Sequence, residues 1–204
     1  SLDKTRDIVA LRGYVEREGD FQWRSGLRLT DLVTDKDALL PKPDLDYALI
    51  RRENPETGVI SVYPLRPRDA FANPDSLDDP ELQNKDQIFF FGTEEGDLRR
   101  EVMDELLDEL RGQTRPGAKA LIVSVSGPVH FPGEYPMSIE MKVSDLIRAG
   151  GNMKDDAYVL SAELTRYRYD DDGGVSIDHV TIESLSALSE NPEQDLVLQP
   201  YDNL

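Results

Sequence analysis

The fold of this chain is decided by the stretch VSVSGPVHFPGEYPMSIEMKVSDLIRAGG, residues 123–151. It contains a short alternating run, a Gly-Pro break, a second short run ended by Pro132-Gly133, and a compact segment before two glycines. The alternation predicts a strand, and the spacing of Val143, Leu146 and Ile147 predicts about two helical turns. Gly150-Gly151 then favours a left-handed helix stop.

The same arrangement occurs earlier, in residues 9–33 (VALRGYVEREGDFQWRSGLRLTDLV), at a constant spacing of 114 positions. The matched pairs are Gly13 and Gly127, Val15 and Val129, Gly19 and Gly133, Phe21 and Tyr135, Leu29 and Val143, Asp31 and Asp145, and Leu32 and Leu146. Further on, Leu49 and Arg51 match Leu164 and Arg166 at 115 positions, and Leu82, Gln83, Asp86 and Ile88 match Leu198, Gln199, Asp202 and Leu204 at 116. This internal duplication indicates two copies of one structural unit.

Each copy is predicted to be a hairpin, a short helix, a second hairpin and a closing strand, in an α+β roll whose small helix covers a curved sheet. Predicted strands are 8–12, 21–23, 47–52, 59–62 and 88–91 in the first copy, and 121–125, 163–169, 175–180 and a closing strand from 195 in the second. Residues 35–46, 73–80 and 170–174 read as loops or turns, and 184–189 as a short helix. Apolar residues at Leu98, Val102, Leu106 and Leu110 predict an amphipathic helix over 94–111. The expected domains are 7–92, a helical connector 93–118, and 119–204.

Composition excludes several functions. The net charge of −18 opposes binding to nucleic acid and to anionic lipid headgroups. No run approaches the roughly 18 apolar residues of a membrane span, and the chain has no cysteine with which to form a disulfide. Ser1 begins abruptly and Leu204 ends inside an expected strand, so we interpret the sequence as a fragment of a longer protein.

Motifs for catalysis and metal binding are lacking in the sequence. Two histidines, His130 and His179, are too few for a histidine-rich metal site, and neither belongs to an H-E-x-x-H pattern. The chain has no G-x-S-x-G elbow and no phosphate-binding G-x-x-x-x-G-K-[ST] loop. The turn at residues 170–174, DDDGG, lacks the further spaced ligands of a calcium loop. We therefore expect no enzymatic activity, no cofactor and no metal.

The second copy combines four motifs: V-x-V-x-G-x-V-x-x-P-G-x-Y, V-x-D-L-I-x-A-G-G, A-E-L-T-R and L-Q-x-x-D. They span Val123 to Tyr135, Val143 to Gly151, Ala162 to Arg166, and Leu198 to Asp202. Together they resemble the soluble-ligand-binding β-grasp (SLBB) domain. The first copy departs from this pattern, because Glu18 stands where Pro132 does and Thr34-Asp35 replaces the residues leading to the double glycine.

Tandem SLBB units resemble those of bacterial polysaccharide export proteins, and the connector RREVMDELLDELRGQTRPG is similar to that of multi-repeat members. The resemblance implies a non-enzymatic periplasmic protein associated with the cell envelope and outer membrane. It also implies ring-like self-association, and polysaccharide and other export components as partners. In that family a signal peptide and an export motif precede the repeats. The alternative is a soluble module that binds an oligosaccharide or small ligand outside any conduit.

Six residues are candidate ligand contacts: Gly127, Pro132, Gly133, Tyr135, Arg166 and Trp23. Each also has a structural interpretation. The glycines suit turns, while Tyr135 and Trp23 are either sugar-stacking platforms or buried rings. Arg166 either pairs with a carboxylate of the fold or reaches an acidic sugar or a neighbouring subunit.

Overall fold

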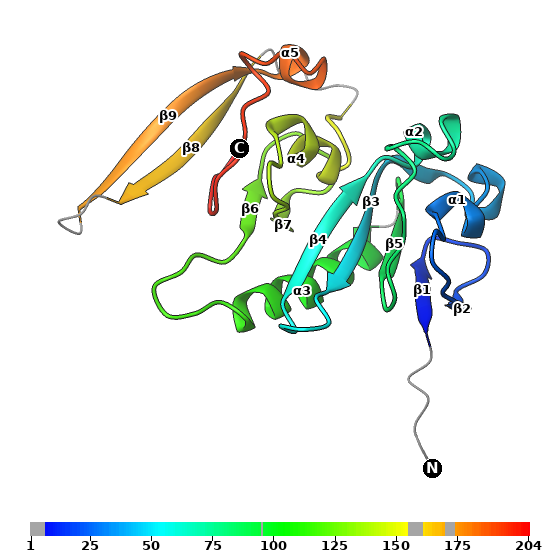
Figure 1. Ribbon diagram of the computed structural model, residues 1–204. Coiled ribbons are helices and arrows are strands. Elements are labelled where there is room, and N and C mark those ends of the chain that lie inside the picture. The colour runs from blue at the N-terminus through cyan, green and yellow to red at the C-terminus, as the bar shows by residue number, and fades with distance from the viewer. Residues whose placement is uncertain (1–6, 95, 155–160, 170–173) are drawn as a thin grey trace. The chain divides into compact units, whose positions relative to one another are not determined.

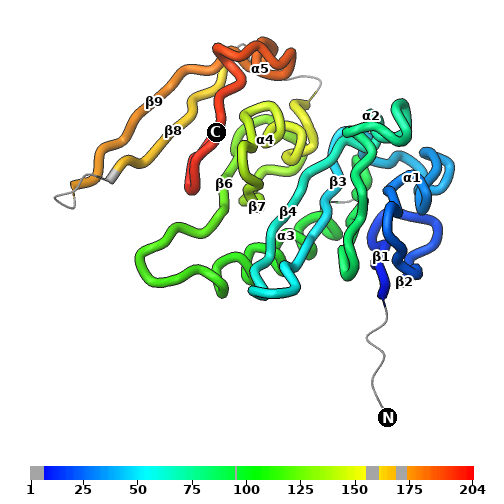
Figure 2. The backbone as a smooth tube through the Cα atoms, viewed as in Figure 1, coloured from blue at the N-terminus to red at the C-terminus, as the bar shows by residue number. Residues whose placement is uncertain are grey.

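The computed structural model describes residues 7–94, 96–154, 161–169 and 174–204, and its fold is α+β (Figure 1). The chain divides into two compact units, Ser1–Arg100 and Glu101–Leu204. The path of the backbone through each unit can be followed in Figure 2. No helix of the described residues is both long enough and apolar enough to span a membrane.

The first unit is built on one five-stranded sheet. Its elements are β1 (Ile8–Gly13), β2 (Gly19–Gln22), α1 (Leu29–Leu32), the 3-10 helix η1 (Lys36–Ala38), β3 (Pro43–Glu53), β4 (Ile60–Leu65), α2 (Pro67–Ala72) and β5 (Gln87–Gly92). The strand order is β2-β1-β5-β3-β4. β5 is parallel to β1 and antiparallel to β3. This central position explains the apolar run of β5, because a strand that is covered on both faces carries no polar alternation.

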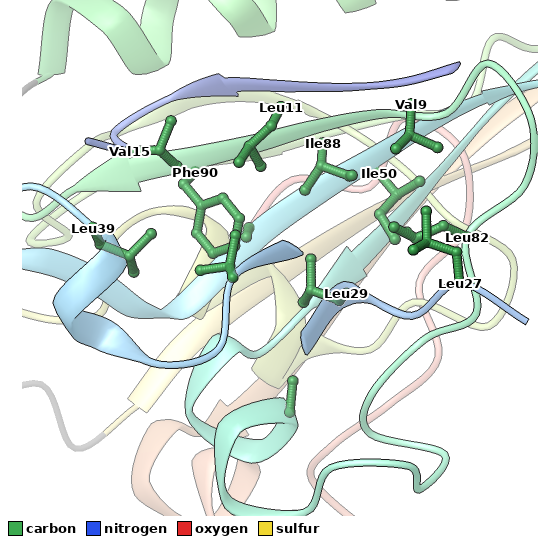
Figure 3. Packing of buried hydrophobic residues seen from close by; sticks show 13 residues of the cluster. Val9, Leu11, Val15, Leu27, Leu29, Leu39, Ile50, Leu82, Ile88 and Phe90 are labelled. Carbon is green, nitrogen blue, oxygen red and sulfur yellow. The ribbon is translucent and has the colours of Figure 1, made fainter. Parts of the chain in front are cut away.

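The core of the first unit lies between one face of this sheet and the helices α1 and α2. Figure 3 shows Val9, Leu11, Ile50, Ile88 and Phe90 of the sheet around Leu29 of α1. The two residues of β1, and likewise the two of β5, are two positions apart, as expected for side chains that point to the same face of a strand. All five are at most 3% exposed. The hydrophobic pattern therefore fixes the register of β1, β3 and β5.

Helix α3 (Gly96–Gly112) runs across the boundary between the two units. The predicted stripe is confirmed at Val102, Leu106 and Leu110, which are buried, whereas Leu98 is only partly buried. The charged Arg99 was not expected in the interior, yet it is only 1% exposed.

Beyond α3, the described residues of the second unit form two antiparallel ribbons and two short helices. Its strands and helices are β6 (Ile122–Val125), β7 (Gly133–Pro136), α4 (Val143–Ala149), β8 (Ser161–Tyr169), β9 (Val175–Glu183) and α5 (Ser184–Leu188). β6 pairs with β7, and β8 pairs with β9. Asn203 joins the ribbons, because it bridges Ser124 in parallel and Thr165 in antiparallel orientation. It therefore takes the place that Gln87 of β5 takes in the first unit.

The duplication seen in the sequence is reproduced in the backbone hydrogen bonds. Val9 faces Phe21 across β1 and β2, and Val123 faces Tyr135 across β6 and β7, in the same register. The other equivalent contacts are Val15–Leu39 and Val129–Met153, Arg28–Glu81 and Lys142–Val197, Leu29–Pro80 and Val143–Leu196, and Lys85–Ile8 and Tyr201–Ile122. The predicted offsets of 114 and 116 positions thus hold in three dimensions.

Two predictions of local structure are wrong, and one helix was missed. Residues 35–46 are not all loop, because they contain η1 and the start of β3. Helix α2 was not predicted; its Pro67 occupies the first helical turn, where a missing N–H is tolerated. Residues 195–199 form no strand, since only Val197 makes an isolated bridge, to Lys142. The predicted turn at 170–174 lies, except for Gly174, outside the described residues.

The glycines at equivalent positions of the two units have different surroundings, which allows a matched test. Gly13 and Gly127 both have positive φ, +85° and +82°. A Cβ at Gly13 would lie 2.4 Å from the Phe90 carbonyl oxygen, whereas none of the atoms around Gly127 would lie within 4 Å. We expect Gly127→Ala to lower the free energy of unfolding by about 1–2 kcal/mol, the cost of the left-handed backbone alone. Gly13→Ala should cost more, because β5 must move.

Urea unfolding measures this difference. Trp23, the only tryptophan, reports the first unit by fluorescence, and amide hydrogen exchange of β6 reports the second. Equal losses in the two variants would contradict the assignment of the Gly13–Phe90 contact.

Candidate functional site

The hairpin tip and the end of helix α4 meet in the second unit. The N–H of Phe131 donates to the carbonyl of Gly150 at 2.8 Å, and the N–H of His130 donates to that of Asn152 at 3.2 Å. A Cβ at Gly151 would lie 2.5 Å from the Phe131 ring, and its φ is +80°. Gly151 is therefore required both for the helix end and for this close approach. Only Gly151 is left-handed, since Gly150 has φ −71°.

Three of the candidate contacts lie exposed on this hairpin: Gly127, Pro132 and Gly133. Gly127 accepts a hydrogen bond from Val129 N–H at 2.9 Å, which closes the tight turn. Gly133 begins β7 with φ +156°. The tip is thus a narrow exposed backbone turn, which offers carbonyl and N–H groups rather than charged side chains.

Tyr135 does not join this exposed surface. Its side chain is buried, at 3% exposure, and its hydroxyl donates to the Phe131 carbonyl at 2.6 Å. The ring therefore supports the hairpin from inside and presents no face on which a sugar could stack.

Trp23 lies in the first unit, apart from the other five candidates. It is partly buried against the core of that unit, and its indole N–H donates to the Leu82 carbonyl at 2.8 Å. This bond fixes the ring against the loop that precedes β5. Of the two interpretations of Trp23, the structure favours the supporting one.

Arg166 forms a two-pronged ion pair with the buried Asp202. Its Nε lies 3.0 Å from Oδ1 of Asp202 and its second guanidinium nitrogen lies 2.6 Å from Oδ2. Asp202 is 1% exposed. Parallel N–H···O bonds of this kind are among the stronger polar contacts in proteins. The guanidinium is thus held by the fold.

The counterpart of Arg166 in the first unit is Arg52, which corrects the predicted match with Arg51. Arg52 binds Asp86 at 2.8 and 2.6 Å, with the same atoms. The spacing between the arginines is 114, as in the rest of the first hairpin, and not 115. The predicted match at 115 positions paired two identical residues, Leu49 and Leu164. At the correct spacing of 114, the residue equivalent to Leu164 is the buried Ile50.

A second buried carboxylate was missed in both units. Asp79 accepts the Thr30 N–H at 3.1 Å and its hydroxyl at 2.6 Å. Asp195 accepts the same two groups of Ser144, at 2.8 and 3.0 Å. Each carboxylate thus satisfies an N–H at the start of the short helix, where no intrahelical partner exists. The signal was present in the sequence as D-x-x-L-Q at a spacing of 116.

The charged groups of the interior are engaged in structural contacts. Arg99 pairs with Asp44, and its guanidinium lies 5.5 and 5.0 Å from the ring centres of Tyr47 and Phe91. Burial raises the pKa of the Asp44 carboxyl, although Arg99 acts in the opposite direction. Burial also raises the pKa of Asp145, whose carboxylate accepts the Lys142 N–H. Among the described residues there is no group of three or more His, Asp or Glu side chains that could hold a metal ion.

Comparison with known protein families gives no match for the chain, and none of the curated proteins matches it significantly.

The Arg166–Asp202 pair generates a direct test of its structural role. Arg166→Ala leaves Asp202 buried without its guanidinium, and we expect a loss of about 3–5 kcal/mol in the stability of the second unit. Arg168→Ala, two residues along β8, should change stability by less than about 0.5 kcal/mol because its side chain is 66% exposed. Hydrogen exchange of β6 and β8 measures both. Similar losses in the two variants would contradict the assigned role.

Asp44 generates a test by pH. Because the folded carboxyl has the raised pKa, it takes up a proton at a higher pH than the unfolded chain does. Its contribution to stability therefore grows as pH falls through the raised pKa, is complete below the ordinary one, and is lost as pH rises again. We expect the stability difference between the natural protein and Asp44→Asn to shift in favour of the natural protein on acidification. Urea unfolding at a series of pH values measures it, and a constant difference would refute the expectation.

Proposed function

We propose that this chain is a non-enzymatic segment of a bacterial polysaccharide export protein, built from two β-grasp units of the SLBB type. The observation that carries the proposal is the doubled hydrogen-bond frame, whose fixed points coincide with the motif positions. Gly127, Gly133, Arg166 and Asp202 each belong both to the motif and to that frame. A sequence pattern that coincides with a repeated physical constraint supports the resemblance better than either does alone.

A scaffold role follows from where the polar groups are used. The charged side chains shared by both units, Arg52 with Asp86 and Arg166 with Asp202, are engaged in holding the hairpins. Asp79 and Asp195 hold the helix starts. A protein whose repeated polar residues are engaged in this way is suited to present surfaces to partners rather than to perform chemistry.

The proposed partners are polysaccharide, further copies of the same protein and other components of the export machinery, at the periplasmic side of the outer membrane. The net charge of −18 suits a passage for anionic polymer, because like charge opposes tight adhesion to the wall. The exposed hairpin tip of Gly127, Pro132 and Gly133 favours the alternative, a module that binds an oligosaccharide or small ligand outside a conduit.

Gene deletion tests the export role. In the organism that makes this protein, we expect loss of the gene to reduce extracellular polysaccharide to background and to leave polymer inside the cell envelope. The natural gene and a variant at an exposed site, Arg100→Ala, should restore secretion. Arg166→Ala, which removes the partner of buried Asp202, should not.

Sedimentation of the full-length protein separates the two candidates. A conduit scaffold is expected to sediment as a closed oligomer. A monomer, together with normal secretion in the deletion strain, would reject the export proposal and support the soluble binding module.

A further inference from the structure

The second unit carries an open pocket away from the candidate hairpin residues. Its volume is about 640 Å³, and its lining residues are Gly117, Ala118, Lys119, Tyr167, Arg168, Gln199 and Tyr201. Pockets that hold small ligands commonly measure about 300–1,000 Å³. Because the pocket is open, it suits one part of an extended ligand better than a fully enclosed small molecule.

Two exposed tyrosines give the pocket its apolar surface. Tyr167 is 39% exposed and Tyr201 is 43% exposed. The Tyr201 hydroxyl accepts the Ala120 N–H at 3.3 Å, and the Tyr201 N–H donates to the Ile122 carbonyl at 2.7 Å. The ring is thus fixed before any ligand arrives, which reduces the entropy lost on binding.

The charge of the pocket is opposite to that of the chain. Its lining includes Lys119 and Arg168 and no carboxylate, although acidic residues outnumber basic ones by 41 to 23 in the sequence. Arg168 pairs with Asp178 at 2.5 Å, but the two side chains are 66% and 39% exposed. Exposed pairs of this kind contribute little to stability. The guanidinium can therefore turn to an anionic ligand, for which it supplies paired donors.

The first unit shows which pocket residues the fold does not require. At the positions of Tyr167, Arg168 and Tyr201 it has Glu53, Asn54 and Lys85. Lys85 keeps the left-handed backbone of Tyr201, with φ +71° against +70°. At the Tyr201 position the backbone is thus common to both units, while the two tyrosine rings and the Arg168 guanidinium are specific to the second. Their presence calls for an explanation other than folding.

We propose that this pocket binds an acidic saccharide, with a pyranose ring against Tyr167 or Tyr201 and its carboxylate at Arg168 and Lys119. Aromatic rings provide the flat apolar face that the C–H side of a sugar ring matches. The Gln199 amide provides a donor and an acceptor for hydroxyl groups. The inference concerns a surface other than the hairpin tip and does not depend on the export role.

Calorimetric titration of the whole chain with tetragalacturonate, and with maltotetraose as the neutral probe, tests the proposal. We expect saturable binding of the acidic probe and binding at least about tenfold weaker of the neutral one. Tyr167→Ala should lower the affinity for the acidic probe by about tenfold, and Arg168→Gln should remove the preference for the acidic over the neutral probe. The matched controls are Tyr63→Ala and Arg100→Gln in the first unit, whose side chains are comparably exposed; they should leave binding unchanged.

Backbone and side-chain amide shifts of Gln199 and Tyr201 in the same titration locate the site. Binding without these shifts, or binding that survives both pocket variants, would overturn the assignment of the pocket. Equal affinity for the neutral probe would overturn the acidic class of ligand. Absence of saturable binding at millimolar probe would overturn the proposal as a whole. None of these outcomes bears on secretion in the deletion strain, so failure here and failure of the export role are distinguishable.

Discussion

The buried carboxylate before the central strand is the constraint on which each unit depends. In the first unit, Asp86 is 0% exposed and receives both the Arg52 guanidinium and the Gln83 N–H. Its carbonyl accepts the Ala10 N–H at 2.8 Å. One residue therefore connects the second hairpin, the loop before β5 and the edge of β1. A buried carboxylate is costly unless it is paired, and here the Arg52 guanidinium and the Gln83 N–H supply the donors.

This constraint explains which parts of the fold could be predicted from sequence. The carboxylate, the hairpin glycines and the apolar character of the alternating positions are retained in both units at spacings of 114 and 116, so they reveal the duplication. The sequence comparison matched Arg166 with Arg51 and not with Arg52, because it compares residue types only. It does not consider which face of the strand each side chain occupies. The burial of Arg99 was not predictable either. Its place depends on Asp44, Tyr47 and Phe91, which lie far from it in the sequence or on another element.

The candidate site was predictable only in its backbone. The sequence indicated turns at the hairpin glycines and a left-handed stop at the double glycine, because both need conformations that few residues adopt. It could not decide between support and contact for Tyr135, Trp23 and Arg166. The side chain supports the fold where a hydrogen-bond partner lies within the unit. These partners are the Phe131 carbonyl for Tyr135, the Leu82 carbonyl for Trp23 and the Asp202 carboxylate for Arg166. Such partners are set by packing between distant segments.

In a duplicated chain, comparison of equivalent positions in the two units separates residues needed for folding from residues that serve another role. Residues that both units retain are those that the common fold requires. Here they are the residues of the ion pairs, the helix starts and the left-handed turns. The longer ribbon of β8 and β9 departs from it, since the pairs Arg168–Ser176 and Tyr169–Val175 extend beyond the last pair of β3 and β4, Glu53–Ile60. Additional exposed strand adds little to a core that is already closed. Tyr167 and Arg168 of the pocket lie where this extension begins, so packing of the shared core does not account for their side chains.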